Sequence, residues 1–217
     1  MSFLREQRRE ETRRRLYEAA LAHFHHDGVA NCRIDDIARS AGVSRASFYF
    51  HYPTKDDVLL EYMRETELVI TSAVDALPKD APLCTVLETM SAALAGVWQP
   101  DPRLLPDVVA VGLRFTATVL TDPSSGRLRQ TMAARFAAAA ERGELTTVLP
   151  TGTLSDLYLG HTVAGMLAWY GHQETPLNVV LHSMNILFFG GVQPGVTKAA
   201  VKKRPSVRGK TAAKKRP

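Results

Sequence analysis

Apolar residues recur along this chain with the spacing of α-helices. In the first predicted helix, residues 7–27, they share one face: Leu16, Ala19, Ala20 and Phe24. A second, short helix repeats the pattern with Ile34, Ile37, Ala38 and Ala41 and ends at Gly42. The third, residues 45–52, follows Ser44, a residue type that caps helix starts. It ends before Pro53, because proline disfavours helical geometry in the residue that precedes it.

A long fourth helix is predicted from Thr54 to Leu77. It opens with Thr54 and Asp57, the spacing of a capping residue followed by an acid at the third helical position. Five more helices are predicted further along, at about 83–98, 103–120, 124–142, 153–172 and 176–190. Prolines separate them, and no segment shows the alternation of apolar and polar residues that is typical of strands. The sequence therefore predicts an all-α fold of about nine helices.

The second and third helices together have the features of a helix-turn-helix, at about residues 33–52. Two helices that cross steeply through a short turn need a small residue at the contact, a residue tolerant of positive φ, and an apolar plug. Ala38, Gly42 and Phe48 meet these needs in that order. In a DNA-binding motif of this kind, Arg45 would meet a base edge and pair with a guanine. An ordinary helical hairpin with a solvated arginine is the alternative.

The run TRRRLYEAALAHFHHDGVANCRIDDIARSAGVSRASFYFHYPTKDDVL resembles the N-terminal domain of the TetR family. The segments AGVS and FYFHY and the lysine after them have that family's separations. The resemblance implies a ligand-responsive transcription regulator that acts as a repressor. A homodimer would bind double-stranded DNA at a palindromic operator and be released by an unidentified small molecule. We expect a DNA-binding domain at 1–53, a helical ligand-binding and dimerisation domain at 54–195, and a disordered basic tail at 196–217.

The resemblance also implies roles for the third helix and its flanks. Base contacts are expected from Arg45, Ala46 and Ser47. Phosphate contacts are expected from Ser44, Tyr49, His51 and Lys55. A phenol, an imidazole and an ammonium near a helix N-terminus are suitable phosphate donors, which agrees with these roles.

Three positions depart from the family pattern. Arg33 stands where a Thr or Ser usually caps the second helix, so that helix starts more weakly or is capped by Asn31. His23 occupies a position usually held by leucine. Ala46 and Ser47 replace a common Gly-Thr pair, which changes the expected base contacts but not the fold.

Beyond about residue 60 the resemblance is architectural only. It implies that the last two long helices form a four-helix bundle with those of a second subunit. The expected interface residues are Gly160, Ala164, Leu177, Val180, Leu181, Met184 and Phe188. Packing of the small residues within one chain is the alternative.

An effector pocket is expected among aromatic and polar residues on the predicted buried helices. The candidates are Trp98, Arg114, Phe115, Tyr158, His161, Met166 and Trp169. Each of them alone is also compatible with a place in the core or on the surface. Aromatic walls favour an effector that is mostly apolar, amphipathic or aromatic.

Charge divides the chain into an acidic body and a basic tail. Residues 196–217 carry nine of the 27 lysines and arginines and none of the 22 acids. The remaining 18 cations and 22 acids give the rest of the chain a net charge of −4. The tail has almost no apolar surface to bury, which predicts disorder in the free protein. A solubilising extension is one interpretation, and an electrostatic arm that binds DNA of any sequence is the other.

Truncation after Pro194 distinguishes the two interpretations of the tail. If roughly four tail cations displace counterions from DNA, their loss should reduce the slope of log K against log salt by about 3.6 per chain. Salt titrations on cognate and random duplexes would measure it, and the cognate footprint should stay in place. Equal slopes for the full and truncated chains would leave the tail without a role in DNA binding.

Other classes of protein find little support in the sequence. Cys32 and Cys84 lie far apart without metal-ligand spacing, and no apolar run is long enough to span a membrane, so we expect a cytoplasmic protein. The cluster of His23, His25 and His26 is more simply a solvated helix end than a metal site. No catalytic motif is visible, and neither an enzyme nor a cofactor is expected.

Two alternative functions stay open at this point. One is an architectural DNA-binding protein that uses its basic tail and is largely independent of sequence. The other is an enzyme or carrier that has kept the helical fold.

Overall fold

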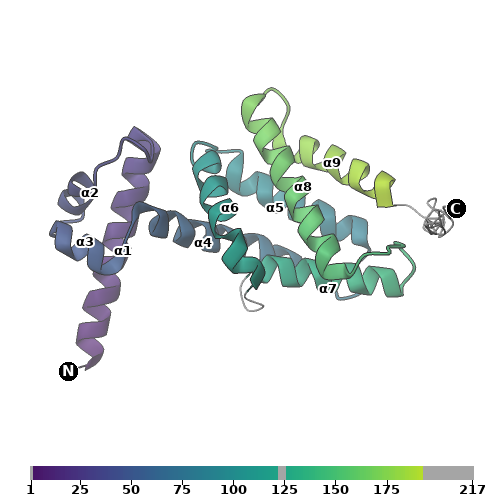
Figure 1. Ribbon diagram of the computed structural model, residues 1–217, viewed down its shortest axis with the longest axis horizontal. Helices are drawn as coiled ribbons and strands as arrows, with labels where there is room; N and C mark the ends of the chain where they lie inside the picture. Colours follow the sequence, from purple (N-terminus) through teal and green to yellow (C-terminus); the bar gives the residue numbers. More distant parts are fainter. Residues whose placement is uncertain (1, 122–125, 193–217) are drawn as a thin grey trace, which may run out of the picture.

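The computed structural model describes residues 2–121 and 126–192, all of whose regular elements are α-helices. Nine helices occur in these ranges: α1 (Ser2–Asp27), α2 (Ile34–Ser40), α3 (Arg45–His51), α4 (Lys55–Asp75), α5 (Leu83–Trp98), α6 (Leu105–Thr121), α7 (Arg127–Glu141), α8 (Thr151–Gly171) and α9 (Leu177–Val192) (Figure 1). The predicted all-α fold is thus confirmed. The basic tail lies outside the described residues.

The helices form two groups that α4 connects (Figure 1). At one end, α2 packs against α1 and α3. At the other end, α4 packs against α5, α6 and α7, while α8 lies between α7 and α9. Because α4 belongs to the bundle and also continues directly from α3, a movement of the bundle is able to reach the first three helices.

The small core of α1–α3 explains why these short helices are stable together. Leu16, Phe24, Ile37 and Phe48 are fully buried, and Tyr52 closes the core beside the start of α4. Helices as short as α2 and α3 are marginal on their own and gain their stability from such packing. Each buried side chain of this size contributes about 1.5–3 kcal/mol by leaving water.

The capping hydrogen bonds predicted from sequence are present at the starts of two of three helices, α3 and α4, and absent at α2. Ser44 caps α3 by accepting from the backbone N–H of Ser47 at 3.2 Å. Thr54 and Asp57 form the expected capping box at the start of α4. At α2, Arg33 makes no capping hydrogen bond. The expectation that Asn31 caps α2 is wrong, because its side-chain amide donates to the carbonyl of Asp27 at the end of α1.

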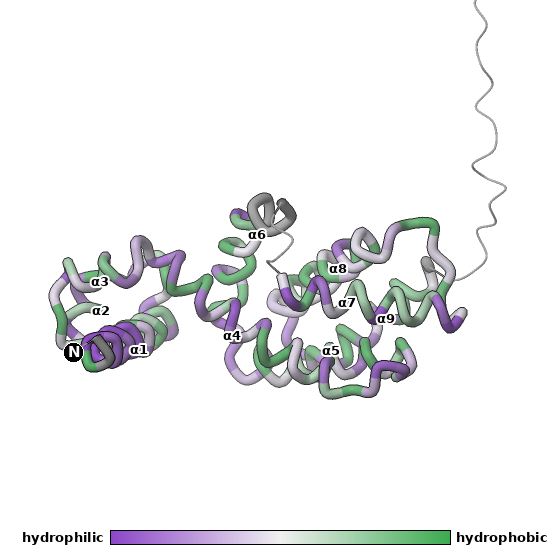
Figure 2. Tube along the Cα trace, turned by 90° about the horizontal axis from the view of Figure 1, so that it is seen from below, coloured by the Kyte–Doolittle hydropathy of each residue, from purple (hydrophilic) through white to green (hydrophobic). Residues whose placement is uncertain are grey.

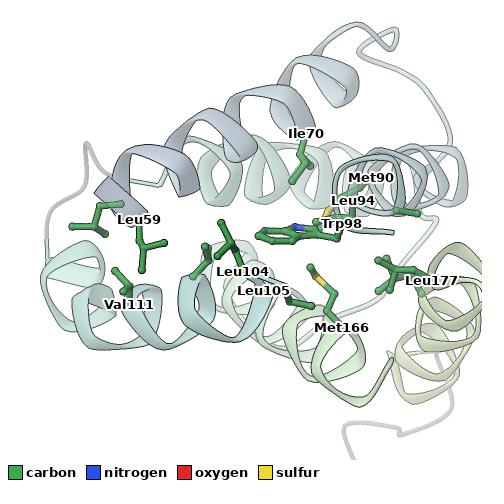
Figure 3. Close-up of a cluster of buried hydrophobic side chains, with 14 of the residues drawn as sticks. Leu59, Ile70, Met90, Leu94, Trp98, Leu104, Leu105, Val111, Met166 and Leu177 are labelled. Atoms are coloured by element: carbon green, nitrogen blue, oxygen red, sulfur yellow. The ribbon is translucent and has the colours of Figure 1, made fainter. Parts of the chain in front are cut away.

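The larger core fills the bundle between α4, α5, α6 and α8. Figure 3 shows Trp98 and Met166 pointing into the same interior as Leu105 and Leu177. The T-shaped contact between Tyr62 and Trp98, with ring centroids 5.9 Å apart, joins α4 to α5. No helix in the described part of the chain has both the length and the apolar character of a membrane span.

Candidate DNA-binding face

The turn between α2 and α3 has the geometry that its residues predict. Gly42 has a φ of +66°, a conformation that most side chains disfavour. Ala38 is buried at the helix crossing, and its carbonyl accepts from the N–H of Val43 at 2.9 Å. Phe48 is fully buried below the turn. These contacts fix α3 across α2 and leave its first residues on the surface.

Arg45 begins α3 and is held in an extended position by two neighbours. Its guanidinium donates to Asp35 at 3.1 Å and to the hydroxyl of Tyr49 at 3.3 Å, and it lies 5.6 Å from the centroid of the Tyr49 ring. The side chain is still 59% exposed. A guanidinium that is oriented in advance and open to solvent loses less side-chain freedom when it binds a partner.

The other residues expected at the DNA surround Arg45. Ala46 and Tyr49 are exposed, while Ser47 is half-buried. The hydroxyl oxygen of Ser44 is occupied as the helix cap, which leaves its proton free to donate. Burial, followed by the nearby charges of Arg9 and Arg13, lowers the pKa of His51. The His51 ring is therefore neutral at neutral pH and offers one N–H to a phosphate.

Lys55 has a structural role that the sequence did not indicate. Its ammonium donates to the backbone carbonyls of Val29 and, at 3.0 Å, of Cys32. It thereby joins the start of α4 to the loop between α1 and α2. A phosphate contact from its third proton stays a prediction.

Lys55→Met tests the two roles of this lysine. Loss of the carbonyl contacts should lower the free energy of unfolding by about 1–3 kcal/mol, because charge-assisted hydrogen bonds to two buried acceptors disappear. Thermal unfolding measures this effect, and a salt titration of DNA binding measures any phosphate contact. Lys79→Met, which removes an exposed lysine from the other end of the molecule, is the control. Unchanged stability would contradict the structural role.

Arg13 is a second residue that sequence reasoning missed. It donates to the carbonyl of His51 at 3.2 Å and to the carboxylate of Glu61, and it stacks over the Tyr52 ring at 4.6 Å. One side chain of α1 thus joins the end of α3 to α4. Its partners lie 38 to 48 positions away in sequence, so no local pattern could have revealed these contacts.

Comparisons with known proteins support a DNA-binding role for the surface around α3. Residues 16–62, from the buried half of α1 to the first turns of α4, match the family described as bacterial regulatory proteins, tetR family. The HTH-type transcriptional repressor SCO4008 of Streptomyces coelicolor is 26% identical over 189 residues, which cover 86% of this chain and 88% of that protein. The N-terminal part of this chain thus matches the TetR family, and its similarity to one repressor extends over most of its length.

Solved structures extend the similarity of fold over most of the chain. The TetR-family repressor FadR of Thermus thermophilus, in complex with lauroyl-CoA, has a TM-score of 0.62 at 22% identity over 82% of this chain and 94% of its own. FadR of Bacillus subtilis, in complex with stearoyl-CoA, has a TM-score of 0.62 at 14% identity over 82% and 98%. At such identities the likeness concerns the fold. The related proteins are transcription regulators, which agrees with the expectation that this chain is not an enzyme.

The residues expected to form an effector pocket do not converge on one hollow. Trp98, Tyr158, Met166 and Trp169 are buried in the core, whereas Arg114 and Phe115 lie exposed on α6. The remaining candidate, His161, is half-buried and donates through Nε2 to the carbonyl of Met184. In this conformation four of these residues pack in the core and two lie on the surface, and their role in an effector pocket stays a prediction.

Arg114 instead joins α6 to the first turn of α4. Its guanidinium donates to Asp56 at 2.7 Å, next to the end of α3. On the same side, a Cβ added to Gly112 would lie 3.2 Å from the sulfur of Met63 on α4. These contacts make α6 and the first half of α4 one packed unit.

Two surface hollows lie along the seam of α5 and α9. One has a volume of about 320 Å³ and is lined by Cys84, Glu88, His182 and Asn185 among others. The other, of about 480 Å³, is lined by small residues such as Ala92 and Gly96. Neither includes a residue expected at the pocket.

A buried polar chain crosses the bundle beside this seam. The hydroxyl of Tyr158 donates to the side-chain oxygen of Asn185, and the amide of Asn185 donates to Ser91, both at 3.0 Å. All three residues are buried. The chain joins α8, α9 and α5 and satisfies each polar group, which buried polar groups require.

Part of the expected dimer interface faces the chain's own core. Leu177 and Leu181 are fully buried within one chain, and a contribution from them to a surface between subunits stays a prediction. Val180, Met184 and Phe188 are half-buried, and Phe188 packs on Tyr158 with ring centroids 5.2 Å apart. Gly160 and Ala164 are exposed on α8 and remain available to a partner. Large apolar side chains of α8 and α9 are exposed too: Leu157, Leu167, Val179, Ile186 and Leu187.

Proposed function

We propose that this TetR-family protein is a ligand-responsive repressor that binds a palindromic operator as a homodimer. The observation that carries the proposal is Arg45, which stands exposed at the start of α3 and is oriented by Asp35 and Tyr49. An arginine in this place suits the guanine edge in the major groove. In a symmetric dimer, two such helices would read half-sites about 34–36 Å apart.

The proposed domains follow the path of the chain. Residues 1–53 would bind DNA, and residues 54–195 would bind the ligand and form the dimer. The outer surface of α8 and α9 supports dimerisation. Exposed large apolar side chains that gather on neighbouring helices are typical of an interaction site, and small residues such as Gly160 and Ala164 allow helices to approach closely.

The proposed effector is a mostly apolar or amphipathic small molecule. The aromatic and sulfur-containing side chains of Trp98 and Met166 in the bundle support this, as does the acyl-CoA bound by the FadR proteins. The effector would enter the bundle and shift α4, which changes the distance between the two α3 helices. It must bind the released conformation more tightly, since a ligand with equal affinity for both conformations shifts nothing.

Gly112→Leu should imitate the effector by forcing α6 and α4 apart. Overpacking of this kind costs about 1–3 kcal/mol, and release of α4 would relieve it, so operator affinity should fall roughly 5- to 150-fold without any ligand. Fluorescence anisotropy on the operator duplex measures it. Gly96→Leu is the matched control, because a Cβ there meets nothing within 4 Å. Unchanged affinity with a lowered melting temperature would show that the strain is absorbed locally.

The test of the proposed function is selection of duplexes from a random pool by the full-length chain, followed by footprinting. A short footprint with two-fold symmetry is the expected result. Even coverage along the duplex would instead favour an architectural DNA-binding protein. The intrinsic fluorescence of Trp98 and Trp169, the two tryptophans of the chain, then provides a screen for effectors.

A further inference from the structure

The first turns of α1 project beyond the three-helix core (Figure 1). Side chains 4–11 are all exposed, and this part of the helix is strongly hydrophilic (Figure 2). Residues 2–15 carry six arginines and three glutamates. No packing accounts for such a helical extension, which makes it a candidate for contact with another molecule.

Three of these arginines form a stripe that follows the second half of α3. Arg5, Arg9 and Arg13 are four residues apart and therefore lie along one side of α1. Arg13 stacks over the Tyr52 ring at 4.6 Å, and Arg9 stacks over the Phe50 ring at 5.2 Å. Arg5 comes next, about 6 Å further along the helix axis at 1.5 Å per residue.

This stripe lies on the side of α3 that is expected to meet DNA. Phe50 comes four residues after Ala46, an expected base contact, and so shares its face of α3. The Phe50 ring is 68% exposed, and Arg9 covers it from α1. Arg9 also lies close enough to His51, an expected phosphate contact, for its charge to help lower the pKa of that ring.

The charges of Arg5 and Arg9 are not neutralised within the part of the chain that the structure describes. Neither forms an ion pair there, whereas Arg14 on the other flank of α1 pairs with Glu11 at 2.9 Å and Glu18 at 2.6 Å. Glu6 and Glu10 follow the two arginines directly and so lie about 100° around the helix from them. Glu10 still lies close enough to His51 to raise the pKa of that ring, which offsets part of the positive charge of the stripe. The planar guanidinium group suits phosphate oxygens, and the Phe50 ring restricts the position of Arg9.

We propose that Arg5 and Arg9 form a phosphate-binding arm on α1 that contacts the DNA backbone beside the segment read by α3. The arm binds duplex DNA without regard to sequence and lengthens the contact of each subunit by one patch of backbone. The inference rests on the proposed DNA binding of α3.

Salt titration of four full-length proteins tests the arm on a duplex selected by the wild-type chain from a random pool. Arg5→Gln and Arg9→Gln should each lower the slope of log K against log salt by about 0.9 per subunit, because one fewer counterion is released. Arg14→Gln, which removes one charge from the same helix, should keep the wild-type slope. Hydroxyl-radical footprints of the Arg5/Arg9 double variant should lose protection at both outer edges and keep it in the centre.

Melting temperatures establish that the variants remain folded. We expect them to be folded, because the side chains of Arg5 and Arg9 are exposed. Equal slopes of log K against log salt for all four proteins would overturn the proposal that Arg5 and Arg9 bind phosphate. An Arg14→Gln slope as low as that of Arg9→Gln would also overturn it, because the effect would then be one of total charge. If the wild-type chain selects no duplex at all, the proposed function fails, and this failure is distinct from that of the arm alone.

Discussion

Arg45→Ala is expected to lose about 1–3 kcal/mol of binding free energy on the operator, a factor of roughly 5 to 150. A bidentate contact with a guanine disappears, while the phosphate contacts that provide general affinity remain. Affinity for a random duplex should therefore change little. Anisotropy titrations on both duplexes at one salt concentration give the comparison.

Arg39→Ala is the matched control for Arg45. Arg39 lies on α2, is exposed, and pairs with an aspartate of its own helix, Asp36, at 2.8 Å. Its removal changes the net charge equally but leaves α3 untouched. If Arg45→Ala weakens operator and random duplex to the same extent, Arg45 contacts phosphate rather than a base. Asp35→Asn provides a second measurement, since it frees Arg45 without removing it and should reduce operator preference by a smaller factor.

The Ile186→Glu/Leu187→Glu double variant is expected to separate the dimer into folded monomers. Both side chains are largely exposed in the single chain, at 60% and 66%, so their replacement should leave the monomer intact. Loss of two buried side chains and the burial of two carboxylates should weaken dimerisation by about 3 kcal/mol or more, over a hundredfold. Analytical ultracentrifugation gives the oligomeric state, and operator affinity should fall with it.

Val148→Glu serves as the control, because it places a charge at an exposed apolar residue of the loop before α8, outside both helices. Persistence of the dimer in the double variant would place the interface on another surface. Substitution of Leu181 would not be diagnostic, since this residue is 1% exposed and a charge there would unfold the bundle of a single chain.

The helices of this protein could be predicted because their signals are local. Apolar spacing, capping residues and prolines gave α2 to α5 with bounds within about two residues, the usual uncertainty at helix ends. The start of α1 was missed by five residues, Ser2 instead of residue 7. Its first turns bury nothing and show no apolar period. Ion pairs such as Arg14 with Glu18 support the next turns, and an apolar pattern does not register them.

The DNA-binding face was only partly accessible from sequence. Arg45 and Ser44 lie in a short motif whose geometry is local, and the structure places both at the start of α3. The carbonyl partners of Lys55 lie 23 and 26 residues away, and only the folded chain brings them together. The inner and outer faces of α9 could not be told apart from sequence for a different reason. The helix is apolar almost all round, so its sequence alone does not show which side faces the core.

Because α9 is apolar on more than one side, its buried asparagine, Asn185, has a role in fixing the orientation of the helix. A helix with apolar residues on two sides is able to turn about its axis, or to slip by one turn, and still bury a similar area. Asn185 removes this freedom, because its amide finds both Tyr158 and Ser91 in only one register. In any other register a buried amide would lose its partners at a cost of about 1–3 kcal/mol. A single polar residue in the core thus fixes which side of α9 faces outward, and with it the surface that the proposed dimer would use.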